Sequence, residues 1–284
     1  MRHGFLLINK PEGPTSHDIV SMVRRMLPEK KIGHLGTLDP AAGGLLVLAV
    51  GAKALKVVEL FSDLSKEYEA DIRFGAVSAT YDREGPIEEV SIKPGVVLPD
   101  DNAVLQMLRT RFVGTIEQVP PAASAVKIGG ERAYRKMRQG KPVDLPAREV
   151  HIDDCSLLSY AYPDLKLSVA CGSGTYIRSL AHDLGQALHV GGYLTALKRT
   201  RVGDWSLDDA VQPDDVQWGH VIPLKEILKN MPSVTLSSDQ WKAVSHGQCI
   251  DGTCTSNTIA WHEHLPVAIL EQKEPGLMKA RKVL

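Results

Sequence analysis

The stretch Gly33-His34-Leu35-Gly36-Thr37-Leu38-Asp39-Pro40-Ala41-Ala42-Gly43-Gly44-Leu45-Leu46 organises the rest of this chain. It places one carboxylate, Asp39, among four glycines, and an apolar run from Leu45 to Val50 follows. Glycine adopts backbone conformations that other residues avoid, and a short apolar run is typical of a buried strand. We therefore predict a tight loop that leads into a buried strand, with Asp39 at its mouth. Taken alone, the Asp-Pro pair also fits a simple turn in which the aspartate caps its own backbone.

The length and composition predict a globular protein with a sizeable core. With 284 residues and 43% hydrophobic content, we expect one large domain and a small one, with a boundary near Asn230. The longest apolar run is far shorter than the roughly 20 residues of a membrane helix, and the first residues lack the features of a signal peptide, so we expect a cytoplasmic protein. The four cysteines form no CxxC pair, which predicts neither a disulfide framework nor a zinc site.

Charge placement is more informative than the net charge of -1, which argues against a general nucleic-acid coat protein. Basic residues cluster between Lys127 and Arg148, and again at Lys198, Arg199 and Arg201. Such runs are often only solvated surface. Because acidic residues concentrate elsewhere, we expect the basic clusters to form one positive face.

Hydrophobic periodicity predicts a mixed α/β chain. Strands are expected at 5–8, 45–50, 68–74, 148–158, 165–171 and 193–202, and helices at 15–27, 52–64, 101–112, 131–139, 177–188 and 223–228. In the strand at 68–74, Tyr68 faces inward and the charged residues face outward. Arg178 lies in the first turn of its helix, where the helix dipole opposes a cation, so we expect a carboxylate partner for it. The chain contains no GxGxxG, P-loop, HExxH or GxSxG motif.

Several motifs together indicate a family. They are Lys10-Pro11-Glu12-Gly13 with Thr15-Ser16, the Gly33-to-Leu46 block, Lys66-Glu67-Tyr68, Gln118 to Lys127, Ala133-Tyr134 through Gly140, and Gly174-Thr175-Tyr176-Ile177-Arg178. On these motifs, from Gly4 to about Trp205, the sequence resembles the TruB-type pseudouridine synthases, the tRNA pseudouridine-55 synthase family. It departs from the family at Ser78-Ala79-Thr80, where Thr-Asp-Thr is frequent, and at Gly43, where threonine is common.

The resemblance implies an α+β fold with a mixed, largely antiparallel sheet flanked by helices over residues 1–230. Residues of about 120–150 would form an RNA-gripping insertion, and 231–284 a small β-rich PUA-like RNA-binding domain, although this tail is short for one. The implied reaction converts uridine 55 in the T-arm loop of tRNA to pseudouridine by base flipping, with no cofactor and no metal. The implied protein is a monomer without an obligate protein partner.

The resemblance also assigns residues to roles. Asp39 would be the nucleophile, Tyr68 would stack on the target base and provide the route for its C5 proton, and Arg178 would pair with Asp39. The residues implied to contact or support the RNA substrate are Lys10, His34, Asp82, Lys127, Arg132, Arg135, Lys136, Tyr176, Leu197 and Arg199. We expect the glycines near Asp39 to let the RNA loop approach the carboxylate.

Two other functions remain open at this point. One is a tRNA-binding and refolding protein without catalysis, and the other is a guided synthase within a larger ribonucleoprotein. The presence of Asp39, Tyr68 and Arg178 together argues against the first. The small tail and the lack of long basic extensions argue against the second.

Overall fold

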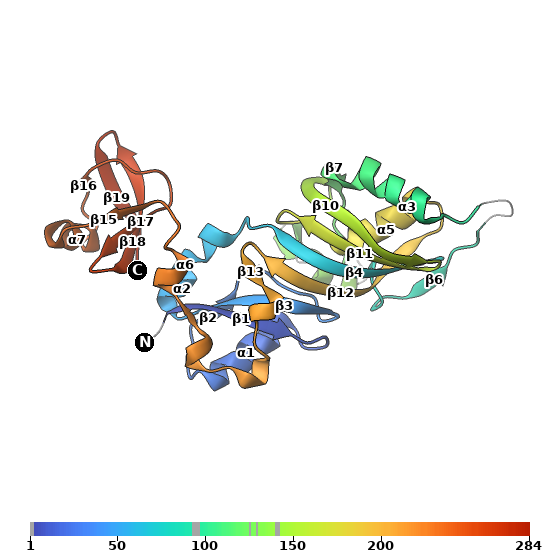
Figure 1. Cartoon of the computed structure of the whole chain (residues 1–284), viewed down its shortest axis with the longest axis horizontal. Coiled ribbons are helices and arrows are strands. Elements are labelled where there is room, and N and C mark those ends of the chain that lie inside the picture. Colours follow the sequence, from blue (N-terminus) through green and yellow to red (C-terminus); the bar gives the residue numbers. More distant parts are fainter. Residues whose placement is uncertain (1–2, 93–96, 125, 129, 140–142) are drawn as a thin grey trace.

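The computed structural model describes residues 3–92, 97–124, 126–128, 130–139 and 143–284, and a ten-stranded sheet forms its centre (Figure 1). In order of hydrogen bonding the strands are β14 (Ile222–Pro223), β1 (Gly4–Lys10), β3 (Ala42–Val50), β12 (Gly192–Val202), β4 (Lys66–Phe74), β11 (Asp164–Cys171), β10 (Arg148–Ala161) and β7 (Gly114–Gln118). Off this path, β2 (Ile32–His34) pairs with β3, and β13 (Trp205–Ser206) pairs with β12. Among these described strands only β3 and β12 pair in parallel, which confirms the mixed, largely antiparallel sheet.

Strand β3 is buried along its whole length because both faces of the sheet are covered there. On one face, Leu46 and Leu48 pack with Ile19 and Val23 of helix α1 (Ser16–Met26). On the other face, Leu45 and Val47 join a second core that includes helices α2 (Ala52–Val57) and α6 (Leu224–Ile227). Strands covered on both sides are continuously apolar, so the run after the glycine loop is explained.

Strand β4 alternates because only one of its faces is covered. Its apolar side chains share a core with Leu180 and Leu184 of helix α5 (Ile177–Ala187). Its charged side chains lie on the other face, where Glu69 pairs with Lys166 of β11 at 3.0 Å. Helix α3 (Asp101–Met107) and the π-helical turn Leu108–Phe112 close the same core near β10.

The parallel junction between β3 and β12 depends on glycine. Gly44 has a φ of +97°, and a Cβ there would lie 2.3 Å from the carbonyl oxygen of Arg199. No other residue type fits so close to a neighbouring backbone. The prediction that these glycines serve RNA approach is wrong for Gly44, because it is the chain's own strand that comes close.

Residues 233–283 form a separate five-stranded sheet with one helix. The strands, in order, are β15 (Ser233–Thr235), β17 (Thr258–His262), β18 (Leu265–Glu274), β19 (Leu277–Val283) and β16 (Ile250–Asp251), with α7 (Ser238–Ser245). Ile259, Ile269 and Leu284 pack into the core behind β1 and β3. Arg281 and Lys282 pair with Glu59 at 2.8 and 2.6 Å, so they dock this sheet against the larger body.

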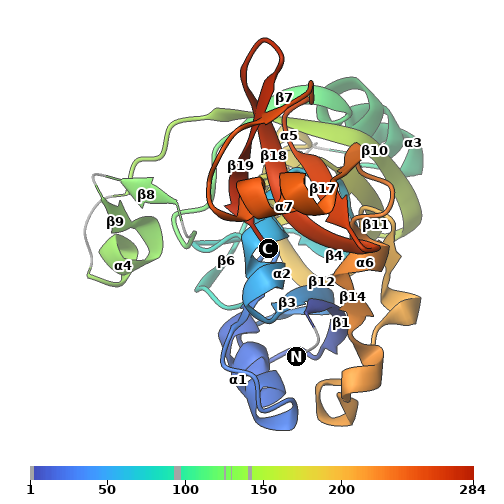
Figure 2. The same ribbon diagram turned by 90° about the vertical axis from the view of Figure 1, so that its left-hand side faces the viewer.

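Two small units project from the main sheet. The unit of β8 (Lys127–Ile128), β9 (Glu131–Arg132) and α4 (Ala133–Arg138) stands out to one side (Figure 2), and β5 (Ala76–Ser78) pairs with β6 (Ile87–Glu89) near the start of β12. The helix expected over 52–64 is shorter, because α2 gives way at Val58 to a 3-10 turn ending at Phe61. Within the described ranges, no helix is long and apolar enough to cross a membrane.

Candidate active site

The loop that carries Asp39 is held from behind by buried polar groups. Lys10 is 1% exposed, and its ammonium donates to the carbonyl oxygens of Pro40 at 3.3 Å and Ala42 at 2.6 Å. The Ser16 hydroxyl donates a hydrogen bond to the carbonyl oxygen of the residue before Asp39 and accepts one from the N–H of that residue, both at 2.9 Å. Lys10 therefore supports the loop, and its donors are already engaged by backbone rather than free for RNA.

Arg178 is the hub of the site. Its side chain is 7% exposed, and Nη2 lies 3.0 Å from Asp39 Oδ2 while Nη1 lies 3.3 Å from Asp82 Oδ2. The same two nitrogens donate to the carbonyl oxygens of Ala123 at 3.1 Å and Thr80 at 3.2 Å. The carboxylate partner expected for Arg178 is present, and a second carboxylate, which the sequence did not indicate, accompanies it.

The two carboxylates differ in exposure. The side chain of Asp39 is 43% exposed, whereas that of Asp82 is 8% exposed. Asp82 also accepts hydrogen bonds on Oδ1 from the Thr80 hydroxyl at 2.5 Å and from the backbone N–H of Glu84 at 3.0 Å. Asp82 is thus a buried anchor for Arg178, and both of its carboxylate oxygens are engaged within the protein. Asp39 is the partner that a substrate can reach.

A ring stack fixes the loop that carries Asp82. Tyr81 has a φ of +64°, and its ring lies flat on His182 with centroids 4.0 Å apart and an interplanar angle of 10°. Its carbonyl oxygen accepts from the N–H of Leu194 at 3.0 Å. His182 lies one helical turn after Arg178, so α5 contacts this loop at two adjacent residues, through the ring stack and through the ion pair to Asp82. Neither ring was predicted from the sequence, although His182 follows Arg178 by four residues.

Tyr68 and Leu197 line a cavity of about 310 Å³ together with Asp39, Arg178 and Tyr176. Burial raises the pKa of the Tyr68 phenol, and the guanidinium of Arg199, which donates a hydrogen bond to it, acts in the opposite direction. The phenol is therefore neutral near pH 7. Tyr68 offers an aromatic face inside a cavity whose mouth holds an accessible carboxylate.

The basic cluster on β12 does not form one positive face, contrary to the prediction. Arg199 is 3% exposed and donates to the carbonyl oxygens of Leu45 at 2.8 Å and Gly36 at 3.2 Å. Lys198 points to the opposite face of the sheet, and Arg201 pairs with Glu67 at 3.4 Å. Only Arg199 reaches the cavity.

A wider cleft of about 840 Å³ adjoins the cavity and shares Asp39 and Arg178 with it. His34 lines one wall, and Tyr134 and Met137 of the projecting unit line another. Burial lowers the pKa of His34, and Arg199 lowers it further, so the imidazole is neutral near pH 7. The cleft therefore extends from the projecting unit to Asp39.

Of the remaining predicted residues, Tyr176 lines the cavity and the others belong to the projecting unit. The side-chain amide of Gln118 accepts a hydrogen bond from the backbone N–H of Tyr176 at 2.7 Å and donates one to the carbonyl oxygen of Tyr176 at 3.0 Å. The guanidinium of Arg148 lies 4.8 Å from the centre of the Tyr176 ring. On α4, Arg135 is exposed and Lys136 half-buried. The side chains of Lys127 and Arg132 lie outside the part of the chain that is described.

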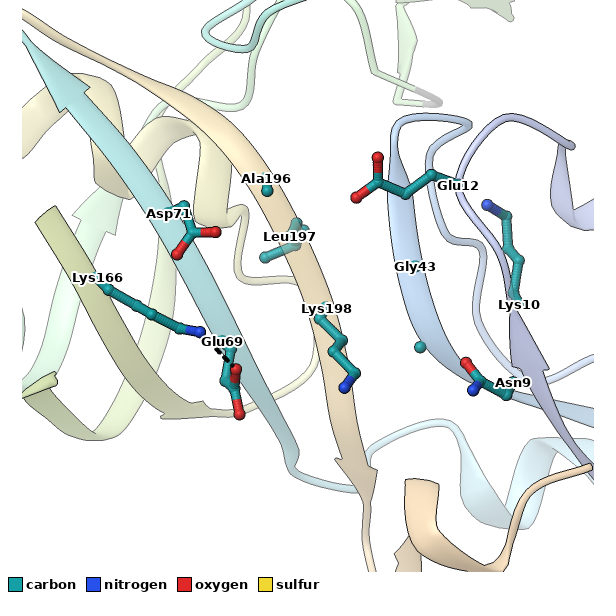
Figure 3. Close-up of a pocket in the computed structure, with 11 residues that line it drawn as sticks. Asn9, Lys10, Glu12, Gly43, Glu69, Asp71, Lys166, Ala196, Leu197 and Lys198 are labelled. Carbon is teal, nitrogen blue, oxygen red and sulfur yellow. Dashed lines mark ion pairs between the residues drawn. The ribbon is translucent and has the colours of Figure 1, made fainter. Parts of the chain in front are cut away.

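A second hollow, of about 270 Å³, lies on the reverse face of the sheet (Figure 3). Glu69, Asp71, Lys166 and Lys198 converge there, with the Glu69–Lys166 ion pair at one side. Asp39 and Tyr68 do not line it. Across the described segments, no group of three or more metal-ligating side chains is placed to hold an ion.

Comparison with known proteins identifies a family. The family model for the TruB family pseudouridylate synthase N-terminal domain matches residues 24–177, and that for the tRNA pseudouridylate synthase B C-terminal domain matches residues 178–230. The tRNA pseudouridine synthase B of Thermobifida fusca (strain YX) is 41% identical over 88% of this chain and 87% of its own length. That of Carboxydothermus hydrogenoformans is 42% identical over 86% of this chain and 84% of its own length.

The solved structure of a Cbf5-Nop10-Gar1 complex contains a chain that aligns with 99% of this one and 84% of its own length. The TM-score is 0.71 at 24% identity, which shows a shared fold. The protein belongs to the TruB family of pseudouridylate synthases. It is accordingly an RNA uridine isomerase with the pseudouridine synthase fold.

Proposed function

We propose that this chain is a tRNA pseudouridine synthase that converts uridine 55 in the T-arm loop of tRNA to pseudouridine, acting as a monomer. Relatives named tRNA pseudouridine synthase B support tRNA as the substrate. One observation carries the proposal: an accessible carboxylate, Asp39, is ion-paired at 3.0 Å to the buried Arg178 at the mouth of a cavity that contains Tyr68. Residues 231–284 would act as a small PUA-like RNA-binding domain.

The target uridine has to leave its stack to reach the cavity. Flipping a nucleotide out costs a few kcal/mol, and stacking on an aromatic side chain recovers about 1–3 kcal/mol per base. Tyr68 provides the aromatic face and Leu197 an apolar wall. His34 lines the wider cleft with a neutral imidazole, so it would support the displaced nucleotide without adding a charge.

The reaction needs no atoms from outside the substrate. Asp39 attacks and forms a transient bond to the substrate, the N1–C1′ bond breaks and the uracil rotates. A C5–C1′ bond forms, the bond to Asp39 breaks, the C5 proton leaves and N1 gains a proton. Arg178 forms an ion pair with Asp39, and the carboxylate is the nucleophilic form of this side chain. It engages Oδ2, and among the described residues Oδ1 has no hydrogen-bond partner, so Oδ1 is the oxygen available for attack. The same carboxylate serves whether it attacks the sugar or the base.

Tyr68 has a limited role as a base in the free enzyme. Because burial keeps its phenol protonated, it can accept the C5 proton only by passing its own proton to another group. Stacking and orientation of the base require no such relay. Tyr68 therefore serves first as the stacking surface and second as a proton route.

The test is to incubate the purified protein with an unmodified tRNA transcript, without cofactor or metal, and to map pseudouridine at every position. We expect conversion at position 55, and its loss in Asp39→Asn with RNA affinity largely retained. Asp71→Asn, on the reverse face of β4, is the matched control and should remain active. Activity that survives Asp39→Asn would overturn the nucleophile assignment. Wild-type protein that binds and refolds tRNA without converting it would instead establish the non-catalytic alternative.

A further inference from the structure

Lys66 is a cation inside the active-site cavity for which the reaction above has no use. It opens β4 two residues before Tyr68, so its side chain lies on the same face of the strand and lines the same cavity. The side chain is half-buried, and its ammonium donates to the carbonyl oxygen of Leu64. Within the described ranges, no carboxylate forms an ion pair with it.

The charges that line this cavity do not balance. Its cations are Lys66, Arg178 and Arg199, and its single carboxylate among the described residues is Asp39, which Arg178 already holds. Arg199 donates to the carbonyl oxygens of two backbone groups rather than to an acid. The lining at the Lys66 end of the cavity is therefore positively charged, because Asp63, the carboxylate whose charge acts on Lys66, does not line it. A partly buried charge without a partner costs free energy that an incoming anion would recover.

The electrostatics agree with this geometry. Burial lowers the pKa of Lys66, and the neighbouring charge of Arg199 lowers it further. An anion placed between the two cations would oppose both effects, because it favours the charged form of Lys66. Ser173 and Gly174 complete the rim beside them.

We propose that Lys66 and Arg199 form a binding site for one phosphodiester group of the RNA backbone, beside the flipped uridine. The inference rests on the proposed function, because the substrate carries its anions only on the backbone. A phosphate is joined directly to the ribose of the flipped nucleotide and so has to lie beside the cavity that holds it. This phosphate is the anion that the positively charged end of the cavity would receive.

The structure supplies a matched control for testing Lys66. Lys198 is a lysine on β12, directly before Arg199 in sequence, but its side chain lies in the hollow on the reverse face of the sheet (Figure 3). Binding of a T-arm stem-loop to full-length Lys66→Met and Lys198→Met should be measured over a range of salt concentrations. We expect Lys66→Met to weaken binding roughly tenfold and to reduce the salt slope by about 0.7–0.9, with Lys198→Met unchanged. An unchanged slope in Lys66→Met, or equal losses in both variants, would overturn the proposal.

A second arm uses the wild-type protein, so that it does not depend on a variant that folds. Stem-loops carrying a single neutral methylphosphonate, on the 5′ or the 3′ side of the target uridine, should show one position at which wild-type binding drops to the level of Lys66→Met. The methylphosphonate at that position should not weaken binding to Lys66→Met any further. Additive losses of binding from the methylphosphonate and the substitution would contradict the assignment. Pseudouridine is mapped in the same samples. Wild-type binding without conversion would refute the proposed function alone, and conversion with an unaltered Lys66→Met would refute the phosphate site alone.

Discussion

Replacing Arg178 by methionine should separate the structural role of its ion pairs from their catalytic role. The Arg178 side chain is 7% exposed and pairs with two carboxylates. The side chain of Asp82 is 8% exposed, whereas that of Asp39 is 43% exposed. Methionine keeps most of the apolar stem but leaves Asp82 buried without its cation. Breaking a buried pair in this way costs about 3–5 kcal/mol. We expect Arg178→Met to lower the free energy of unfolding by about that amount.

Two double variants show where this loss arises. Adding Asp82→Asn to Arg178→Met removes the stranded charge and keeps the Oδ1 that accepts from Glu84, so roughly 1–3 kcal/mol should return. Adding Asp39→Asn instead should return less than about 1 kcal/mol, because that carboxylate remains well solvated. Urea unfolding followed by circular dichroism at pH 7 measures all four proteins. Equal recovery in the two double variants, or none with Asp82→Asn, would refute the distinction between a buried anchor and an accessible partner.

Catalysis should not follow stability in this series. Conversion of unmodified tRNA should be lost in Arg178→Met and should stay lost in its Asp82→Asn double variant, because Asp39 no longer has the guanidinium that orients it. A double variant that regains both stability and pseudouridine formation would show that Arg178 acts only through the fold.

The elements with a clear hydrophobic pattern could be predicted from the sequence. The apolar run after the glycine loop and the alternation from Tyr68 to Phe74 indicated a strand covered on both faces and a strand covered on one. The need of Arg178 for a carboxylate followed from its place in a helix. The number of carboxylates did not, because Asp82 reaches Arg178 only through the packing of its loop against β12 and α5.

The basic cluster on β12 shows what a pattern alone could not supply. Simple alternation would put Arg199 and Arg201 on one face of the strand and Lys198 on the other. The register shifts between Arg199 and Arg201, and Arg201 turns to pair with Glu67 on the reverse face. A bulge of this kind depends on the neighbouring strand. The close approach at Gly44 likewise involves a partner, the backbone of Arg199, that is distant in sequence.

Two further predictions concern α5. Tyr81→Ala should lower the single-turnover rate by roughly two- to tenfold, the equivalent of about 0.5–1.5 kcal/mol for a lost ring stack. Tyr81→Phe keeps the ring and should keep the rate. Equal losses of rate in both variants would assign the effect to the hydroxyl instead. The second is a stability effect of Asp183, whose carboxyl pKa burial raises from 3.8 to about 6. Because the pKa of Asp183 is higher in the folded state, folding favours the protonated carboxyl. The stability that this carboxyl contributes is present below pH 3.8 and is lost as the pH rises through about 6. Asp183→Asn, which mimics the protonated form, should therefore raise the free energy of unfolding by about 2–3 kcal/mol at pH 8 and by no more than about 0.5 kcal/mol at pH 4. Urea unfolding at the two pH values measures the difference, and the same gain at both would mean that the charge of Asp183 is not its source.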